Sequence, residues 1–280
     1  MNLATLIPVL LKVSIWLIVF SFGLGLNWHD LSGLLKNPSL LLRSLFAMIL
    51  VMPLFSLLMV KTFDLNPPVG VALLALALSP IPPMIPGKGL KAGGNSSYAF
   101  SLLFVAGLLS ILFVPIGVKI YGLIFNRPIA IPAAAIAKIM LMAVLAPLTA
   151  GILFCRIFPA LAKKIEKPIS WLAGIMLLIC IIPLLINGLP AIISLIGNGT
   201  VAALAAFIIV GLIIGHAFGG PRKENRIVLA LSTASRHPGV AIAISSTTVT
   251  DQQLIFAAVL LFLLLNLVIT QIYLYWVNKG

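Results

Sequence analysis

The chain has 280 residues, of which 62% are hydrophobic and 8% are charged, and its mean hydropathy is +1.24. Soluble domains average about 45–50% apolar and about 25% charged residues, so this composition excludes a water-soluble protein and indicates that much of the surface faces lipid. Because each helical crossing needs about 20 apolar residues, we expect one integral membrane domain over residues 1–280, with no separate soluble catalytic domain.

Charge and cysteine content exclude two further classes of function. The net charge of +13 comes from basic residues in short gaps between apolar runs, a pattern that indicates membrane topology and not a nucleic-acid surface. Cys155 and Cys180 both fall within apolar runs. We interpret them as small buried hydrophobic side chains and expect neither a disulfide nor a metal site.

The apolar runs predict an all-α membrane protein with nine transmembrane helices. Each run is long enough to cross as a helix, and none shows the sustained period-two alternation of a barrel strand. In chain order the predicted helices cover about 3–26, 38–60, 69–92, 96–123, 131–155, 168–187, 199–218, 226–248 and 253–277.

Loop charges predict the orientation of these helices. An odd number of crossings puts the termini on opposite sides, and the cytoplasmic side carries the excess of Lys and Arg. With the N-terminus outside, the outer side keeps only Lys61, Lys119 and Arg127. The inner loops and their flanks then hold Lys36, Arg43, Lys88, Lys91, Arg156, Lys163, Lys164, Lys167, Arg222, Lys223, Arg226 and Lys279. We therefore expect an integral membrane protein with its N-terminus outside and its C-terminus in the cytoplasm. Lys12 and Lys138 lie near the middle of predicted spans, and both snorkelling and a place inside the bundle remain open.

The third and eighth predicted helices are interrupted. The same tetrapeptide, Leu-Ala-Leu-Ser, ends at Ser79 and at Ser232, and it precedes the proline-rich stretch 80–87 and the stretch 233–239. Proline removes a backbone donor and clashes with the preceding turn, so neither stretch continues an α-helix. Irregular backbone at membrane depth survives where it is packed in protein or lines a cavity, and a pair of oppositely directed broken helices indicates the midplane site of a secondary transporter. Two proline kinks in an inert bundle are the alternative.

Arg236 and His237 lie in the second interruption. A buried guanidinium is costly without a partner, and no acidic residue falls within a predicted span. Its partner is therefore a set of carbonyls or hydroxyls, or a bound anion; a purely structural role, in which Arg236 links the two broken helices, remains open. The ordinary pKa of histidine near 6.5 makes His237 a candidate proton carrier, although a hydrogen-bonded filler is the alternative.

The candidate substrate-binding residues are polar or small side chains at the two interruptions. We expect polar contacts from Arg236, Ser79, Ser232, Thr233 and Asn95, and close backbone approach at Gly87 and Gly239. Asn266, in the last span, is a weaker candidate that serves equally well as a hydrogen bond between helices.

Four motifs together resemble the bile acid:sodium symporter family. They are Phe22-Gly-Leu-Gly-Leu26, Met52-Pro53, Ala92-Gly-Gly-Asn95 and the stretch from Ser232 to Ala241. The resemblance covers essentially the whole chain, with degenerate motifs, and fits a bacterial member of the nine-span type, which implies a place in the bacterial inner membrane. It implies two inverted repeats that form a core domain (about 38–123 and 199–277) with two crossing discontinuous helices, and a panel domain (about 3–26 and 131–187).

The resemblance also implies sodium-coupled uptake of organic anions, but the residues that bind sodium in the family are replaced. The family's glutamine before the Met-Pro pair falls here on Met48, and its Ser-Asn pair in the first interruption falls on Ile85 and Pro86. In the second interruption, its glutamate falls on Ser232 and its Gln-Asn pair falls on Arg236 and His237. A hard cation needs oxygen ligands with compensating negative charge. We therefore expect transport that does not depend on sodium, with the Arg236 guanidinium standing where a sodium ion would bind.

These observations favour a secondary transporter that moves a small organic anion by alternating access. Its expected partners are that anion, the lipid bilayer and, through His237, protons; no cofactor, metal or nucleic acid is expected. A passive channel or a non-transporting scaffold is the alternative. An intramembrane enzyme is disfavoured because neither an HExxH motif nor a membrane-depth aspartate pair is present, and the spacing of Ser232 and His237 permits a dyad without indicating one. No catalytic residue is therefore assigned.

Overall fold

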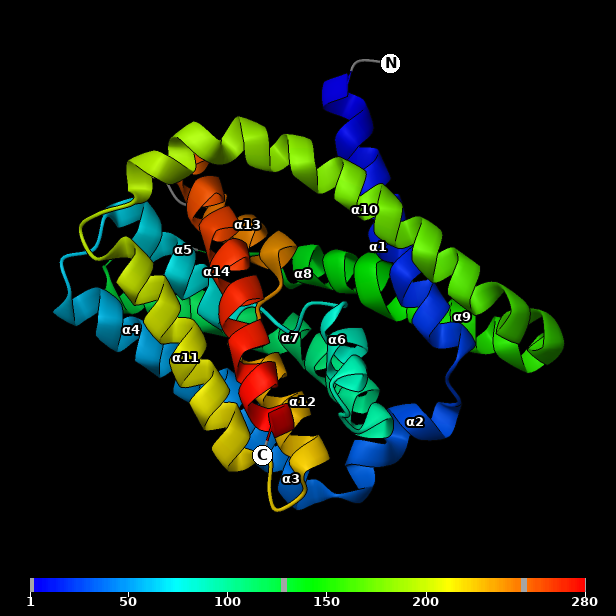
Figure 1. The fold of residues 1–280 in the computed structure, drawn as a ribbon. Coiled ribbons are helices and arrows are strands. Elements are labelled where there is room, and N and C mark those ends of the chain that lie inside the picture. Colours follow the sequence, from blue (N-terminus) through cyan, green and yellow to red (C-terminus); the bar gives the residue numbers. More distant parts are fainter. Residues whose placement is uncertain (1–2, 127–129, 248–250, 280) are drawn as a thin grey trace.

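The computed structural model describes residues 3–126, 130–247 and 251–279, and this part of the chain is helical with no β-strand (Figure 1). It contains eight helical segments long and apolar enough to cross a membrane. They are Leu6–Leu24, Pro38–Thr62, Ser96–Ile124, Ala133–Ile157, Pro159–Leu195, Thr200–Phe218, Lys223–Ser245 and Gln252–Lys279. The expected all-α membrane fold is thus confirmed, whereas a ninth crossing stays a prediction. Arg127 and the last residue of the eighth predicted span, Thr248, lie outside the described residues.

The third predicted span is interrupted, as expected, and neither of its two short helices is among these eight, whereas the eighth span has a shorter break and counts as one segment. Helix α5 (Pro67–Leu78) and helix α6 (Ile85–Lys91) are separated by non-helical backbone. Likewise, α12 (Lys223–Ala234) and α13 (Pro238–Ser245) make up the eighth. Both interruptions are shorter than predicted, because Pro86 and Pro238 occupy the first turns of α6 and α13. Proline is tolerated there, where its missing N–H has no intrahelical partner to lose.

The second and fifth predicted spans each contain a π-helical turn. The second consists of α3 (Pro38–Leu45), a π turn at Phe46–Val51 and α4 (Met52–Thr62). The fifth consists of α8 (Ala133–Met140), a π turn at Leu141–Leu145 and α9 (Ala146–Ile157). In both, the second residue of the following helix is a proline, Pro53 or Pro147. A proline in a span interrupts the regular hydrogen-bond ladder, and a local shift to the π register accommodates it.

Helix α10 (Pro159–Leu195) is much longer than the predicted span at 168–187. It runs without a break through Pro168, Pro183 and Pro190, and the predicted inner loop at 156–167 is reduced to a single non-helical residue, Phe158. Lysine and glutamate are good helix formers, so the basic stretch that was expected as a loop extends the helix beyond its apolar part. In Figure 1, α10 follows the edge of the molecule, crosses α1 (Leu3–Leu24) and reaches α14 (Gln252–Lys279).

Glycines bring neighbouring helices into close contact. Along α11 (Thr200–Phe218), a Cβ on Gly211 would lie 2.8 Å from the Cα of Ala234, and a Cβ on Gly215 would lie 2.5 Å from the Cα of Ala230. Helix α1 and helix α9 approach in the same way, because a Cβ on Gly151 would lie 2.8 Å from the Cα of Gly23. Small residues let membrane helices pack backbone to backbone, which strengthens van der Waals contact where the hydrophobic effect is absent.

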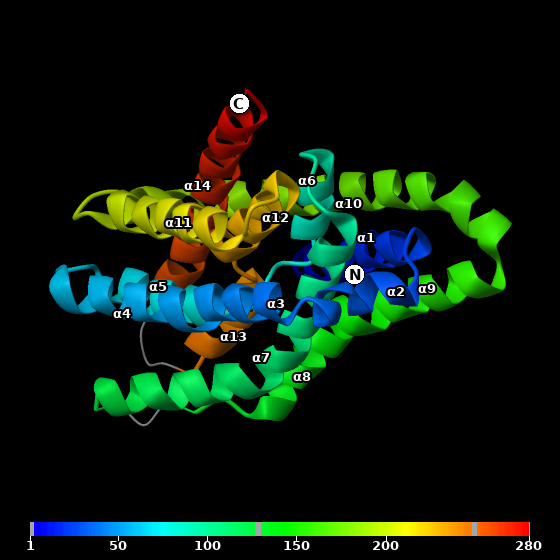
Figure 2. The ribbon, with the colours of Figure 1, turned by 90° about the horizontal axis from the view of Figure 1, so that it is seen from below.

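Buried apolar side chains form one large and two small clusters. The large cluster joins α4, α5, α7 (Ser96–Ile124) and α11 to α14, and it also includes residues of α8 and of the end of α10. The small clusters join α1 to α9 and α10, together with α2 (Trp28–Ser32) and α7. Figure 2 shows α11 and α12 on one side of α4 and α5, and α8 on the other. The division into core and panel domains stays a prediction.

The structure places two lysines whose location the sequence left open and two cysteines that were expected to be buried. Lys12 and Lys138 are exposed on α1 and α8, so neither enters the bundle, and their aliphatic stems can carry the ammonium groups toward water. Cys180 is buried and Cys155 is partly buried, and both are free thiols.

Candidate functional site

The two interruptions meet inside the protein. We call Ser79–Met84, between α5 and α6, the first interruption, and Ser235–His237, between α12 and α13, the second. The backbone N–H of His237 donates to the carbonyl of Pro80 across 2.9 Å. Ser79, Ser235 and Arg236 are all buried. Proline-induced breaks far apart in the sequence therefore satisfy each other's backbone groups, as irregular backbone must where no water is present.

Arg236 links both interruptions to the second span. Its side chain is 1% exposed, and its Nη1 donates to the carbonyl of Ser79 at 3.2 Å while its Nη2 donates to the carbonyl of Met48 at 3.4 Å. The guanidinium also lies 5.9 Å from the ring centre of Phe207 in α11, within the range of a cation–π interaction. One charged group thus bridges α5, the π turn of the second span and α11.

The carbonyl of Met48 is available to Arg236 because of Pro53. In the π turn the N–H of Met52 donates to the carbonyl of Ala47. In this π register each N–H donates to the carbonyl five residues earlier, so the carbonyl of Met48 would accept from residue 53. Residue 53 is a proline and has no N–H to donate. The Met-Pro pair therefore leaves the carbonyl of Met48 free to accept, at the position where the family resemblance expects a polar glutamine side chain. In the sequence, the Met-Pro pair was the one feature that could have indicated this acceptor.

No carboxylate neutralises Arg236. All five acidic residues of the chain are described, and none of them pairs with this guanidinium, whose contacts among the described residues are carbonyls and an aromatic ring. The charge is therefore balanced only by dipoles. In a low-dielectric interior this leaves a net positive potential at the junction of the two interruptions.

Three buried polar atoms close to this charge have no partner among the described residues. They are Oγ1 of Thr233, Nε of Arg236 and Nε2 of His237. The Nδ1 atom of His237 accepts from the N–H of Val240 at 3.4 Å and caps α13, which assigns the proton of a neutral ring to Nε2. All three atoms are consequently hydrogen-bond donors, and an unsatisfied buried donor costs about 1–3 kcal/mol. An arrangement of donors beside a positive charge suits an anionic acceptor.

A second hydrogen-bond chain approaches the second interruption from α14. Nδ2 of Asn266 donates to the carbonyl of Ala234 at 3.0 Å, and its Oδ1 accepts from the hydroxyl of Ser235 at 3.1 Å. The hydroxyl of Thr270 donates to the carbonyl of Asn266 and in turn accepts from the ammonium of Lys88 in α6. Asn266 therefore hydrogen-bonds between α14 and the end of α12, which is the alternative to a substrate contact that the sequence left open.

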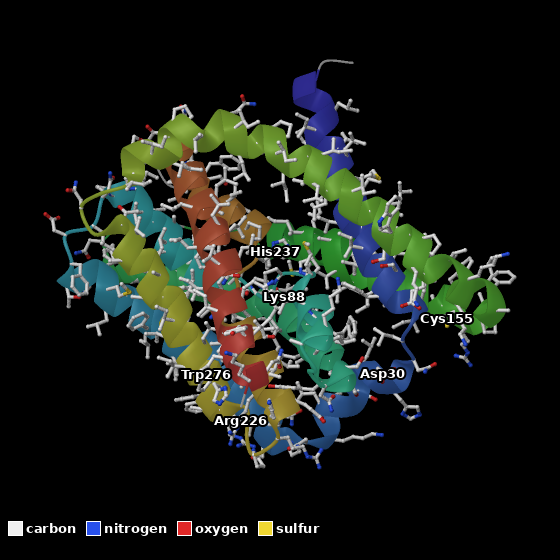
Figure 3. The ribbon with its side chains drawn as sticks, viewed as in Figure 1. Asp30, Lys88, Cys155, Arg226, His237 and Trp276 are labelled. Carbon is white, nitrogen blue, oxygen red and sulfur yellow. The ribbon has the colours of Figure 1, made fainter. Side chains whose placement is uncertain are left out.

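Lys88 makes a contact that sequence reasoning missed. It was counted among the charges flanking an inner loop, which stays a prediction, and in the structure it is partly buried and bonded to α14. Figure 3 labels Lys88 and His237 near the middle of the bundle, away from Arg226 and Asp30 at its ends. Its position after a proline-rich break was a weak signal, and nothing in the sequence pointed to Thr270 as its partner.

The remaining candidates have local roles in this structure. The side-chain oxygen of Asn95 caps α7 by accepting from the N–H of Tyr98 at 2.8 Å. A Cβ on Gly87 would lie 2.6 Å from the ring of Phe22, so this glycine makes room for α1. The hydroxyl of Ser79 bonds to the carbonyl of Ala75 within α5. In addition, Ser232 is buried in α12, Ile85 and Pro86 begin α6, and Gly239 lies against the ring of His237.

Comparison with known proteins is consistent with the resemblance noted in the sequence. A family model described as "Sodium Bile acid symporter family" matches residues 12–195, a range that contains the first interruption and ends before the second. Curated proteins named "P3 protein" are similar: the one from Homo sapiens is 28% identical over 210 residues, which cover 70% of this chain and 41% of the relative. The one from Bos taurus is 28% identical over 162 residues, which cover 54% of this chain and 32% of the relative. The one from Mus musculus is 27% identical over 215 residues, which cover 70% of this chain and 42% of the relative. The chain thus spans about a third to two fifths of the length of these relatives.

Proposed function

Because the chain belongs to the sodium bile acid symporter family, we propose that it is a secondary transporter that moves a small organic anion across the membrane by alternating access. One observation carries the choice of an anion. Three buried donors on Thr233, Arg236 and His237 have no partner in the described part of the chain, and they lie within five residues of each other beside a guanidinium that no carboxylate neutralises. An anion satisfies the donors and the charge together, whereas a cation would satisfy neither.

The proposal assigns Arg236 the place of a coupling ion. The carbonyls of Ser79 and Met48 are oxygen ligands of the kind that a hard cation uses, and in this chain they accept from the guanidinium. A tethered charge is not carried across the membrane and supplies no driving force. Transport is therefore independent of a sodium gradient and runs as facilitated diffusion, as exchange, or linked to protons through His237.

The proposal includes the finer architecture expected from the sequence. The segments α5–α6 and α12–α13 each count as one crossing, which makes nine, and the inverted repeats form a core (about 38–123 and 199–277) and a panel (about 3–26 and 131–187). The N-terminus lies outside and the C-terminus lies in the cytoplasm of a bacterial cell. The hydrogen bond between the two interruptions, which both belong to the proposed core, supports this division. No enzymatic step is proposed.

Transport assays with the purified protein test the proposal. A thermal-shift screen of mono- and dicarboxylates identifies a ligand, and uptake of that ligand, radiolabelled, is then measured in proteoliposomes with an inward gradient of sodium or of choline. We expect saturable uptake that is stimulated by unlabelled ligand inside and is equal in the two gradients. Uptake that requires the sodium gradient would refute the role given to Arg236, and non-saturating conductance would indicate a channel.

A further inference from the structure

Two arginines from distant parts of the chain converge on one glycine near the end of α11. Nε of Arg226, in the first turns of α12, donates to the carbonyl of Gly220 at 2.6 Å. A Cβ on Gly220 would lie 3.5 Å from Nη1 and 3.6 Å from Nη2 of Arg43 in α3. Gly220 has a φ of +82°, a conformation in which a larger side chain would be strained. Both guanidinium groups thus lie against Gly220, in the loop between α11 and α12.

This pair of arginines has no counter-charge in the described structure. Nε of Arg43 donates to the carbonyl of Ser39 at 3.1 Å, and Nε of Arg226 donates to that of Gly220. The Nη groups of both arginines have no hydrogen-bond partner among the residues that the structure describes. All five acidic residues are described, and Glu224, which is exposed at the start of α12, pairs with neither arginine. Both side chains are only partly exposed, so water screens their repulsion incompletely.

The surroundings place this pair at the boundary between lipid and water. Nδ1 of His216, near the end of α11, and the hydroxyl of Tyr273 in α14 are 2.8 Å apart. The ring of Trp276 lies 5.8 Å from the ring of His216 and is 64% exposed. Arg226 and Trp276 are labelled at the same end of the molecule in Figure 3. Tryptophan and tyrosine concentrate at the headgroup level of a bilayer, and basic pockets between helices at that level bind anionic headgroups.

We propose that Arg43 and Arg226 bind the phosphate group of an anionic phospholipid. A phosphodiester offers oxygen acceptors that match the paired Nη donors of a guanidinium, and it removes the repulsion between the two charges. The N-terminal end of α12, a helix of 12 residues, faces the same loop and adds a favourable dipole. The bound headgroup therefore holds α3 against the N-terminal end of α12, and the other end of α12 leads into the second interruption with Arg236.

The test compares lipids and soluble phosphate on the same protein. The full chain is placed in nanodiscs of phosphatidylcholine alone, or of phosphatidylcholine with a quarter phosphatidylglycerol, and thermal unfolding is followed. We expect phosphatidylglycerol to raise the midpoint by about 2–4 °C in the unmodified protein and not in Arg43→Gln/Arg226→Gln. The control Arg156→Gln/Lys163→Gln removes two exposed basic residues elsewhere and should keep the full shift.

Two further arms separate the possible explanations. Arg43→Lys/Arg226→Lys keeps the charges and should retain part of the shift, which distinguishes a lost site from a misfolded variant. Glycerol 3-phosphate added to phosphatidylcholine nanodiscs should have no effect at millimolar concentration; an equal shift from this soluble phosphate would overturn the assignment to lipid. A phosphatidylglycerol shift of the same size in the double glutamine variant, or no shift in the unmodified protein, would overturn the site itself.

Discussion

Replacing Arg236 by methionine or by alanine separates the charge of this side chain from its volume. Methionine fills most of the space of the arginine stem without a charge, whereas alanine leaves a cavity. Arg236 is among the largest fully buried side chains of the protein, so both changes act on a closed interior. A matched control is Lys12→Met, which removes a basic residue from the exposed face of α1.

Two opposing terms decide the effect of Arg236→Met on stability. The change leaves the carbonyls of Ser79 and Met48 without a donor, at a cost of about 1–3 kcal/mol each. It also removes a buried charge that no carboxylate neutralises, whose burial costs several kcal/mol. We expect these terms to cancel to within about 3 kcal/mol of unfolding free energy. Arg236→Ala adds the cavity and should be less stable than Arg236→Met by about 2–5 kcal/mol.

The assay is equilibrium unfolding of the two variants in one detergent, followed by ligand binding on whichever variants fold. Loss of a charge-assisted interaction of about 2–3 kcal/mol weakens anion binding by about 30- to 150-fold in both variants, and Lys12→Met should bind as the unmodified protein does. If Arg236→Met unfolds as readily as Arg236→Ala, the guanidinium contributes far more than its two carbonyl bonds explain. If both variants bind anions undiminished, Arg236 has only a structural role.

Three further predictions follow from the same contacts. Ser232→Glu combined with Arg236→Gln restores two of the polar residues that the family uses for sodium. We expect sodium chloride, but not choline chloride, to raise the unfolding temperature of this variant alone. If sodium chloride has no effect, the idea that Arg236 replaces a sodium ion is contradicted. Gly215→Leu places a side chain against the backbone of α12, at 2.5 Å already for its Cβ, and should prevent folding in expression tests, whereas Gly174→Leu, at an open position of α10, should be tolerated. Pro53→Ala restores a backbone N–H at residue 53, which competes with Arg236 for the carbonyl of Met48. A double-mutant cycle of Pro53→Ala and Arg236→Met should therefore show a coupling of about 0.5–1.5 kcal/mol in unfolding free energy. Additive effects of the two changes would contradict that competition.

Several features of this protein were determined by the sequence alone, since they depend on composition or on covalent geometry. An apolar content this high requires lipid contact, and helices are the structures that satisfy every backbone group of such runs internally. The two interruptions were predictable because Pro80 and Pro238 lack an N–H wherever they stand. The boundaries were less certain: Pro86 and Pro168 lie inside helices, because the effect of a proline depends on its position in the turn.

Tertiary packing alone decided which groups meet. No pattern in the sequence indicates that Arg236 reaches the carbonyl of Met48, almost two hundred residues away, or that Lys88 bonds to Thr270 instead of facing water. The cap that Asn95 provides to α7 was likewise not foreseen, and its place at the substrate site stays a prediction. Propensity and hydropathy act on neighbours within a turn or a span, so they determine where helices form and where they break. The partners of a buried polar group depend on how those helices pack, and they become visible only when the whole chain is in place.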